Sequence, residues 1–552
     1  MKHILLCIIL SLSALQVWAA ERDTVYLTGD IQHDGLFATV PISGAAKESW
    51  APVNHRSNTY LTLGIRREYT ITNIVDYHGY EGSIRYELMP WAMPGYDASF
   101  DGHGLAHFHA GWNFGWGKVT IGDVYGQFGS GLILHLYEDR PLGIDNALRG
   151  GKIEAKLYKG IHTTIIGGKQ RRYWSSLDDG AWGFHYERDA VLGADLKLTL
   201  SDWIQPMRAA GANLTIGASW VSKYEARDST LVPIDGQMYY RIEPRWVGAT
   251  DVRVGFQMHG WQALIEYAYK ANDPSTVNQF DYTSGNAILA SLSYSRKGLS
   301  VLLQGKRNKN MAFRSARGLA PESNCGYINH LPAFTRRHTY MLPSIYPWAT
   351  QPLGEWGVQA EVRYTAPRKS ALGGKYGTTF ILNASHLRGL DNRHYYTDVH
   401  LELNKKIDKQ WYIAAMLMYQ ACDLTVLQGH GDMVHAGIGV MDVKYAITND
   451  IHLRGELQYL YTAQDKGQWT AALLELALYK HWMISGQWMY NIGGTTSATN
   501  EHFYTAGVTY TIGAHQLMLS YTKTKDGYNC SGGVCRWVPK QEGVSMSYTF
   551  NW

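Results

Sequence analysis

A loop that is dense in ionisable residues follows a Gly-Ser-Gly break at 129–131. It contains acids and bases close together: Glu138, Asp139, Arg140, Asp145 and Arg149. Opposite charges at such spacing pair when water is excluded, and charges of both signs also mark the constrictions of pores. The group therefore predicts either a loop held by its own ion pairs or a loop that lines a ligand-selective passage.

A second group of charges lies in the long connection 306–354, where seven basic residues oppose one acid, Glu322, giving a local charge of +6 in a chain of net charge +4. The basic residues are Lys306, Arg307, Lys309, Arg314, Arg317, Arg336 and Arg337. In a lumen the four arginines would narrow a pore and favour anions, and outside they would bind lipopolysaccharide phosphates. A solvated loop is the third reading. Because aromatic residues and prolines are frequent here, we expect an ordered loop with the four arginines facing the passage.

Cys530 and Cys535 enclose Ser-Gly-Gly-Val in another long loop. In an exported chain thiols are oxidised, and the glycines let the chain turn back sharply, so we expect a disulfide. A redox-active pair is the alternative, although such pairs usually have the shorter C-x-x-C spacing. Cys325 and Cys422 lie far apart in sequence and either pair with each other or remain thiols.

Two histidine clusters have a composition that zinc would accept. They are Asp101, His103, His107 and His109, and His430, Asp432 and His435. Histidines on a Gly-rich polar face are more often ordinary lining, so we expect neither a metal site nor a cofactor. No G-x-S-x-G elbow occurs, because Gly129-Ser130-Gly131 misses its spacing. We therefore expect no enzyme, although acids and bases from different strands could still converge.

The elements that position these residues are β-strands, and the clearest is 543–552. Its apolar side consists of Val544, Met546, Tyr548, Phe550 and Trp552. A period of two indicates a strand, and about ten residues suffice for a tilted strand to cross a bilayer. A terminal strand that ends on Phe or Trp after alternating aromatics resembles the assembly signal of bacterial outer-membrane barrels. Tyr548, Phe550 and Trp552 form that predicted signal.

Similar alternation, with charge on one side only, recurs along the chain, as in 152–158, 194–200, 398–404 and 451–461. In the C-terminal half, short turns such as Gly513-Ala514 alternate with long loops, as in outer-membrane barrels. The alternation is lost between 201 and 251. We predict an all-β fold: a single large transmembrane antiparallel β-barrel with a strand number in the low twenties, short periplasmic turns and long extracellular loops. Such a barrel is too wide for its strand side chains to fill.

Residues 1–19 have the pattern of a secretory signal peptide, with Lys2, an apolar run at 4–15 and small residues before the expected cut after Ala19. The expected barrel then occupies 20–552. The chain is rich in Tyr (38), Trp (19) and Gly (57), with no shift in composition that would mark a second domain. A net charge of +4 is too small to indicate nucleic acid as a partner.

The segment from Gly122, GDVYGQFGSGLILHLYEDRPLGIDNALRGGKI, resembles the hallmark of an uncharacterised family of Bacteroidota outer-membrane barrels. Similar pieces are KQRRYW from Lys169, NMAFRS from Asn310, TYMLPSIYPWATQPLGEWG from Thr339 and YNCSGGVCRWVP from Tyr528. The resemblance implies a barrel in the bacterial outer membrane, and it implies no activity and no catalytic residue. Read physically, the hallmark is a strand to about Gln127, the glycine break, and a second strand to about Glu138.

These features predict a channel or uptake protein for small polar solutes, anions among them. The expected partners are outer-membrane lipid, lipopolysaccharide, the barrel-assembly machinery and other envelope proteins. The alternative is a scaffold in an envelope assembly whose lumen is closed by its own loops, and a barrel enzyme is a third reading. A plug in the lumen would favour the scaffold, and an open lumen would favour the channel.

Overall fold

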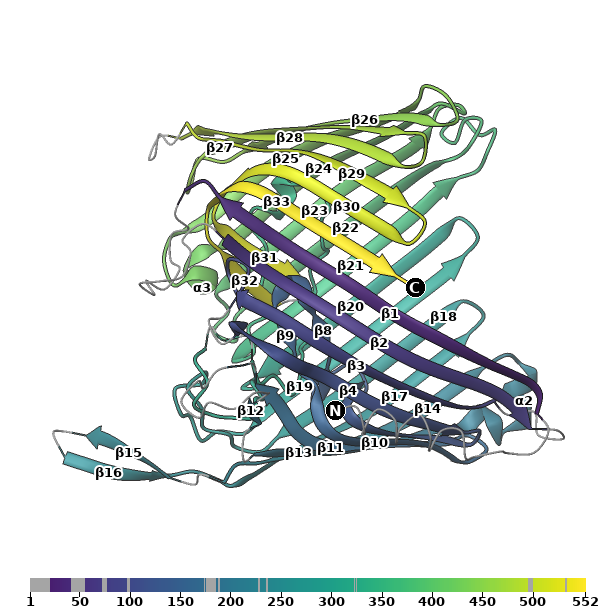
Figure 1. Ribbon diagram of the computed structural model, residues 1–552, viewed down its shortest axis with the longest axis vertical. Helices are drawn as coiled ribbons and strands as arrows, with labels where there is room; N and C mark the ends of the chain where they lie inside the picture. Colours follow the sequence, from purple (N-terminus) through teal and green to yellow (C-terminus); the bar gives the residue numbers. More distant parts are fainter. Residues whose placement is uncertain are drawn as a thin grey trace.

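The described part of the chain forms one closed antiparallel β-barrel of 24 strands (Figure 1). The structure, a computed structural model, describes residues 20–40, 55–71, 77–96, 100–172, 174, 185–186, 189–226, 229–234, 237–321, 323, 325–494, 500–531 and 534–552. Each barrel strand pairs with the next one along the chain, and β33 pairs with both β30 and β1, which closes the ring. The predicted all-β barrel with a strand number in the low twenties is confirmed.

The first barrel strands are β1 (Ala20–Ala38), β2 (His55–Ile71), β3 (Tyr77–Trp91), β4 (Gly102–Phe114), β5 (Gly117–Val124), β10 (Leu148–Tyr158), β11 (Ile161–Arg172), β13 (Ala190–Thr199), β14 (Asn213–Tyr224), β17 (Trp246–Met258), β18 (Trp261–Lys270) and β19 (Gly285–Arg296). The remaining ones are β20 (Leu299–Lys309), β21 (Gly354–Ala366), β22 (Thr378–Arg388), β23 (His394–Lys406), β24 (Trp411–Asp423), β25 (Met433–Ala446), β26 (Ile451–Tyr461), β27 (Gln468–Leu478), β28 (Trp482–Gly493), β29 (His502–Ile512), β30 (His515–Thr524) and β33 (Gln541–Asn551).

The connections carry the other elements. These are β6 (Gly126–Gln127), β7 (His135–Leu136), β8 (Glu138–Asp139), η2 (Arg140–Leu142), β9 (Ile144–Asp145), β12 (His185–Tyr186), η4 (Leu200–Asp202), α2 (Gln205–Ala209), β15 (Ser229–Ile234), β16 (Gln237–Ile242), η5 (Leu342–Ser344), α3 (Leu424–Gln428), β31 (Gly527–Ser531) and β32 (Val534–Val538). Among the described residues, no helix has both the length and the apolar character needed to cross a membrane.

The outer surface of the barrel is apolar. On β26, Leu457 and Tyr459 are 67% and 45% exposed, whereas Glu456 and Gln458, which alternate with them, are buried in the interior. The predicted alternation is thus confirmed. Large apolar side chains that are exposed on strand after strand form the belt that a barrel presents to lipid, with the polar set facing the lumen.

Short turns join the strands at one end of the barrel, and longer connections lie at the other, at the left of Figure 1. The turn His259-Gly260 has φ of 47° and 86°, the conformation of a tight hairpin that suits glycine. The predicted loss of alternation after Ser201 has two causes. Helices η4 and α2 lengthen a connection at the short-turn end, and the β15–β16 hairpin projects from the other end.

The hallmark segment differs from its prediction, because its expected second strand is not part of the barrel wall. Strand β5 ends at Val124, and the chain crosses the interior before it returns to the wall as β10. Gly129 and Gly131 have positive φ of 51° and 90°, which turns the chain inward. Ile133 and Leu134 are consecutive and both fully buried. A strand in the wall would have exposed one of them to lipid, and an interior segment does not.

The C-terminal strand has the predicted orientation. Val544 is 43% exposed on the outer side, and on the inner side Ser547 donates a hydrogen bond to Asp34 of β1 at 2.7 Å. Trp552 continues the pairing, because its backbone exchanges two hydrogen bonds of 3.1 Å with Gly29. The predicted signal peptide lies outside the described residues.

The predicted disulfide between Cys530 and Cys535 is confirmed, and it joins β31 to β32 near the tip of their hairpin. Cys325 and Cys422 are buried in two different hydrophobic clusters, so they do not pair with each other.

Candidate functional site

Two long connections, 125–147 and 310–353, meet inside the lumen, and together they are called the plug. Their backbones are hydrogen-bonded: His135 N–H donates to the Ile328 carbonyl at 2.8 Å, and His330 N–H donates to the Gly131 carbonyl at 3.1 Å. The Asn329 amide bridges them further by donating to the carbonyls of Leu132 and Met311, both at 2.8 Å. The plug is therefore one folded unit made from two distant parts of the sequence.

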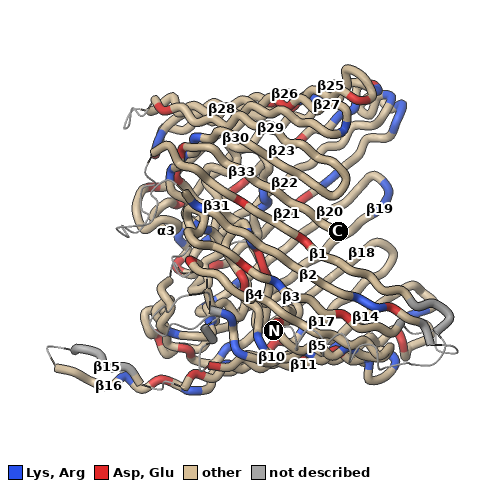
Figure 2. The backbone as a smooth tube through the Cα atoms, in the orientation of Figure 1, with Lys and Arg blue, Asp and Glu red and all other residues tan. Residues whose placement is uncertain are grey.

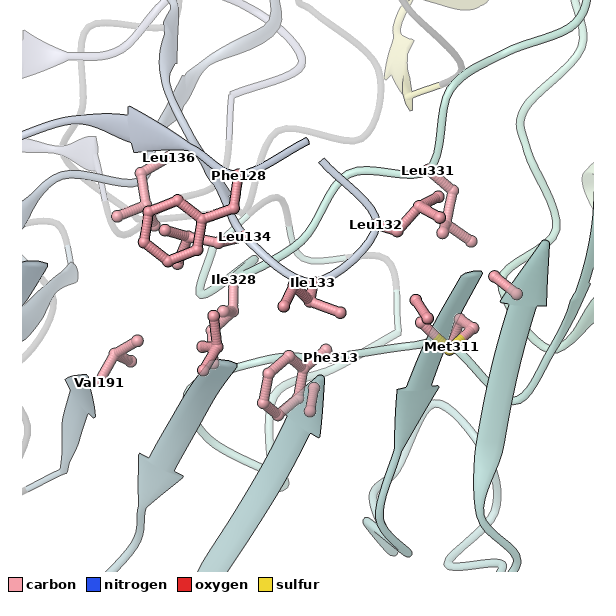
Figure 3. Packing of buried hydrophobic residues seen from close by; sticks show 14 of the residues in the cluster. Phe128, Leu132, Ile133, Leu134, Leu136, Val191, Met311, Phe313, Ile328 and Leu331 are labelled. Carbon is pink, nitrogen blue, oxygen red and sulfur yellow. The ribbon is translucent and has the colours of Figure 1, made fainter. Parts of the chain in front are cut away.

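Hydrophobic packing fixes the plug to both sides of the barrel. Figure 3 shows Phe128, Ile133 and Phe313 of the plug, which pack in one hydrophobic cluster with strand residues of the wall. The strand residues in this first cluster include Val191, Val221 and Val247. On the opposite wall, Tyr346 and Trp348 pack with Met416, Met418 and Trp469. The loop 306–354 is thus ordered, as expected, and it packs against the wall.

Three buried lysines on the inner wall hold the second half of the plug by its backbone. Lys223 of β14 donates to the Arg314 carbonyl at 2.8 Å, Lys270 of β18 to the Ala312 carbonyl at 2.7 Å, and Lys306 of β20 to the Pro332 carbonyl at 2.6 Å. Each ammonium also has a buried acid. Lys223 lies 2.8 Å from Asp273, Lys270 3.8 Å from the same carboxylate, and Lys306 2.8 Å from Glu355. These charges therefore anchor the plug and do not line a passage.

The first half of the plug is held by arginines of the wall. Arg85 of β3 pairs with Glu138 and Asp145, each at 3.0 Å, and Arg171 of β11 pairs with Asp145 and with Glu87. Burial alone would raise the pKa of Asp145. The positive charges of Arg171 and Arg85 outweigh burial and lower the pKa to about 2. Glu138 and Asp145 thus belong to an ion-pair network whose buried basic partners, Arg85 and Arg171, come from strands that the sequence did not connect to this loop.

The other candidates of this segment have different surroundings. Asp139 caps η2 by accepting from the Leu142 N–H at 3.2 Å, and Arg140 pairs with Glu138 at 3.1 Å. Arg149 does not line the lumen. It lies on β10 with the same parity as the outward-facing Ile153, and it pairs with Asp123 at 2.8 Å.

The four arginines from 314 to 337 are also divided, so the expectation that all of them face a passage needs correction. Arg317 is buried and pairs with Glu225 at 2.6 Å and Glu243 at 3.4 Å. Arg314, Arg336 and Arg337 line cavities. Lys306, Arg307 and Lys309 belong to β20, so they are part of the wall and not of the loop. The excess positive charge of the loop is balanced largely by wall acids, which periodicity alone could not locate.

Three cavities follow one another along the lumen. The mouth cavity, of about 600 Å³, lies among the long connections and includes Gly95 and Trp537 in its lining. The middle cavity, of about 480 Å³, lies within the plug and shares His330 and Tyr528 with the mouth cavity. The lower cavity, of about 580 Å³, reaches Gln257 and Gln262 beside a short turn, and it shares Ser130, Pro332 and Ala333 with the middle one. The plug thus divides the lumen into cavities, and neighbouring cavities share lining residues.

The cavity linings are basic. Arg314 and Arg536 line the mouth cavity, Arg336 and Arg337 the middle one, and Lys197 the lower one. Among the described residues, no Asp or Glu lines any of the three. Acidic residues are nevertheless frequent among the long connections at the left of Figure 2. The cavities therefore lack described acids because the acids of these connections lie elsewhere, and not because the connections contain few of them. Such a lining favours anions.

His338, Asp398 and His400 form one of two groups whose possible ligand atoms lie within 4.8 Å of one another; the other consists of Glu87, Glu138 and Asp145, which already pair with Arg85. Both oxygens of Asp398 accept hydrogen bonds from the two histidines at 2.8 Å. The guanidinium of Arg336 lies 3.2 Å from the second nitrogen of His400. A positive charge at that distance opposes a cation, so the cluster is better suited to hold Arg336 than a metal. The predicted histidine clusters do not form such a group within the described residues.

The sequence matches the model of a family of unknown function, DUF6029, over residues 1–552. The chain belongs to the DUF6029 family. The predicted resemblance to a family without an assigned activity is therefore confirmed. No curated protein matches the chain in sequence.

Solved structures similar to this DUF6029 protein include the siderophore receptor PirA from Pseudomonas aeruginosa, with a TM-score of 0.40, 8% identity, and coverage of 96% of this chain and 81% of that one. Others are OccAB4 from Acinetobacter baumannii, with a TM-score of 0.33, 7% identity and coverage of 97% and 99%, and OpdQ from Pseudomonas aeruginosa, with a TM-score of 0.35, 9% identity and coverage of 84% and 98%. Similarity at this level carries no information about a shared ligand or mechanism.

Several residues of the site were missed by the sequence reasoning. They are Arg85, Arg171, Lys223, Lys270, Asp398, His400 and Arg536. All but Arg536 lie on barrel strands. A buried role for an inward charge could have been suspected from alternation, but its partner lies in a connection far away in sequence.

Proposed function

We propose that this DUF6029 protein is an uptake barrel of the bacterial outer membrane for small polar solutes, with a preference for anions. The observation that carries the proposal is the row of three lumenal cavities, which are lined by basic residues and by no described acid. Neighbouring cavities share lining residues, so a modest movement of the plug would join them. In the membrane, the long connections would face the outside and the short turns the periplasm.

Selectivity would arise mainly in the middle cavity. Arg336 reaches it from the plug and lies 3.2 Å from Glu402 and 3.6 Å from Glu361 on the wall. Removal of Arg336 would uncover these two acids to the passage. The cavity would then change from a basic to an acidic lining, and its preference should move toward cations.

The test is the reversal potential of the purified protein in a planar bilayer across a KCl gradient. Wild type is expected to be anion-selective, and Arg336→Ser with Arg337→Ser should shift the potential toward the cation side. Arg208→Ser, on α2 at the short-turn end, is the matched control and should leave the potential unchanged. A conducting double variant with the wild-type potential would refute the role of the middle cavity.

A scaffold in an envelope assembly is the second candidate, and the packing of the plug against both walls favours it. A scaffold needs a closed lumen and no solute path. Wild-type protein that folds and inserts but conducts no ion under any voltage would support the scaffold against the uptake barrel.

A further inference from the structure

The mouth cavity is lined by aromatic rings and by two arginines. Tyr96, Tyr327, Tyr528 and Trp537 line it, together with Arg314 and Arg536. These residues come from three connections: the segment after β3, the plug, and the β31–β32 hairpin. Its volume of about 600 Å³ is in the range of small-molecule binding sites, roughly 300–1,000 Å³.

Arg536 carries the hydrogen-bonding capacity of this cavity. Its guanidinium lies 4.3 Å over the Tyr96 ring, so one face is occupied by stacking. Its Nε and Nη1 are buried and donate no hydrogen bond within the described structure. Burial lowers the pKa of Arg536, and the smaller effects of Tyr96 and Asp139 act in the opposite direction. In the part of the chain that the structure describes, no carboxylate lies close enough to form an ion pair with Arg536. A buried guanidinium with unused donors is costly unless an anion binds to it.

Arg314 has a different role in the same cavity. Its guanidinium donates to the carbonyls of Ala320 and Pro321 at 2.8 and 2.9 Å and to the Tyr327 hydroxyl at 2.9 Å. These acceptors are neutral, so its charge remains available to attract an anion. The guanidinium also stacks 4.4 Å from the Tyr327 ring and thereby holds that ring in the cavity lining. Arg314 is thus a positioning residue that adds positive potential.

We infer that the mouth cavity is a binding site for a small organic anion that carries an aromatic ring. A carboxylate or phosphate of the ligand would accept hydrogen bonds from Arg536, and the ring would lie among Tyr327, Tyr528 and Trp537. An inorganic anion would use only the charge, and a neutral ring would use only the aromatic lining. The inference deepens the proposed function by naming the class of solute that binds first, and the binding itself does not require passage.

Isothermal titration calorimetry of the full mature chain in detergent tests the site, with phenyl phosphate, inorganic phosphate and benzyl alcohol as probes. Phenyl phosphate should bind more tightly than either of the others. Arg536→Gln should weaken it by about tenfold or more, as expected for loss of a charge-assisted hydrogen bond. Arg536→Lys keeps the charge without the planar fork, so its affinity for phenyl phosphate should lie between those of wild type and Arg536→Gln. Arg208→Gln at the opposite end should bind like wild type.

For every variant, folded protein is identified by its heat-modifiable band on a gel. If Arg536→Gln is misfolded, the affinity of Arg536→Lys tests the inference instead. Equal affinity of wild type and a folded Arg536 variant would overturn the inference, as would equal affinity for phenyl phosphate and inorganic phosphate. The proposed function fails separately. Binding without permeation would leave the site standing and refute uptake, whereas anion-selective permeation without saturable binding would refute the site alone.

Discussion

At the scale of single residues, most buried charges of this protein hold the plug. Lys306 and Glu355 show this most clearly, because they lie on the neighbouring strands β20 and β21 that enter and leave the longer plug segment. Lys306 binds the Pro332 carbonyl, and Glu355 accepts from the Trp348 indole at 2.8 Å and from the Gln351 N–H at 3.2 Å. One ion pair thus holds the middle of the segment and its C-terminal end.

Replacement of Lys306 by Met should loosen the plug without opening the barrel wall. The carboxylate of Glu355, which is 0% exposed, would remain buried without its counter-charge, at a cost of about 3–5 kcal/mol. Limited proteolysis with mass spectrometry should show new cuts within 310–353. The double variant Lys306→Met with Glu355→Gln removes both charges and keeps an acceptor, so it should be cut less. If the double variant is cut as readily as the single one, the ion pair is not what holds the segment.

His135 should make plug stability depend on pH. Burial, with a smaller contribution from His330, lowers the pKa of His135 from 6.5 to about 4. Between these values the unfolded chain binds a proton that the folded one does not, so stability is full above pH 6.5 and falls as the pH drops toward 4. Hydrogen exchange of 125–147 should therefore accelerate across this window, and less so in His135→Gln. The same acceleration in both proteins would contradict this assignment.

At the scale of elements, the sequence was informative where one residue in two faces lipid and uninformative where the chain leaves the wall. The terminal strand and the strands from β21 onward follow from alternation and turn spacing. The segment 131–138 also looked like a strand, but its apolar residues are buried between the rest of the plug and the wall. Contacts such as Lys223 with the Arg314 carbonyl join positions that share no local pattern. For that reason only the second half of the plug was foreseen as an ordered loop, and its anchors were not foreseen.

The β31–β32 hairpin forms part of the lining of both the mouth and the middle cavities. Cys530→Ser with Cys535→Ser should leave barrel assembly intact, because the wall is closed without it, and should make 525–540 easier to cleave. Phenyl phosphate binding should weaken in the same variant, since Arg536 lies next to Cys535. Unchanged cleavage and unchanged binding would show that strand pairing alone keeps the hairpin in place.

At the scale of the whole molecule, a wide barrel must either hold water or be filled, and this protein does both. The plug packs against opposite walls, yet it leaves three basic cavities between the mouth and the short-turn end. A lumen built only to be closed would not need basic linings free of described acids. Loop movement that joins the cavities would convert the same architecture into a selective path.

The most direct measurement of that claim is permeation into proteoliposomes that contain wild-type protein, with a small organic anion, benzoate, compared with a cation of similar size, benzylammonium. The account predicts that benzoate enters several-fold faster than benzylammonium, and faster than into protein-free liposomes. Folded, inserted protein that admits neither solute above the protein-free rate would contradict it.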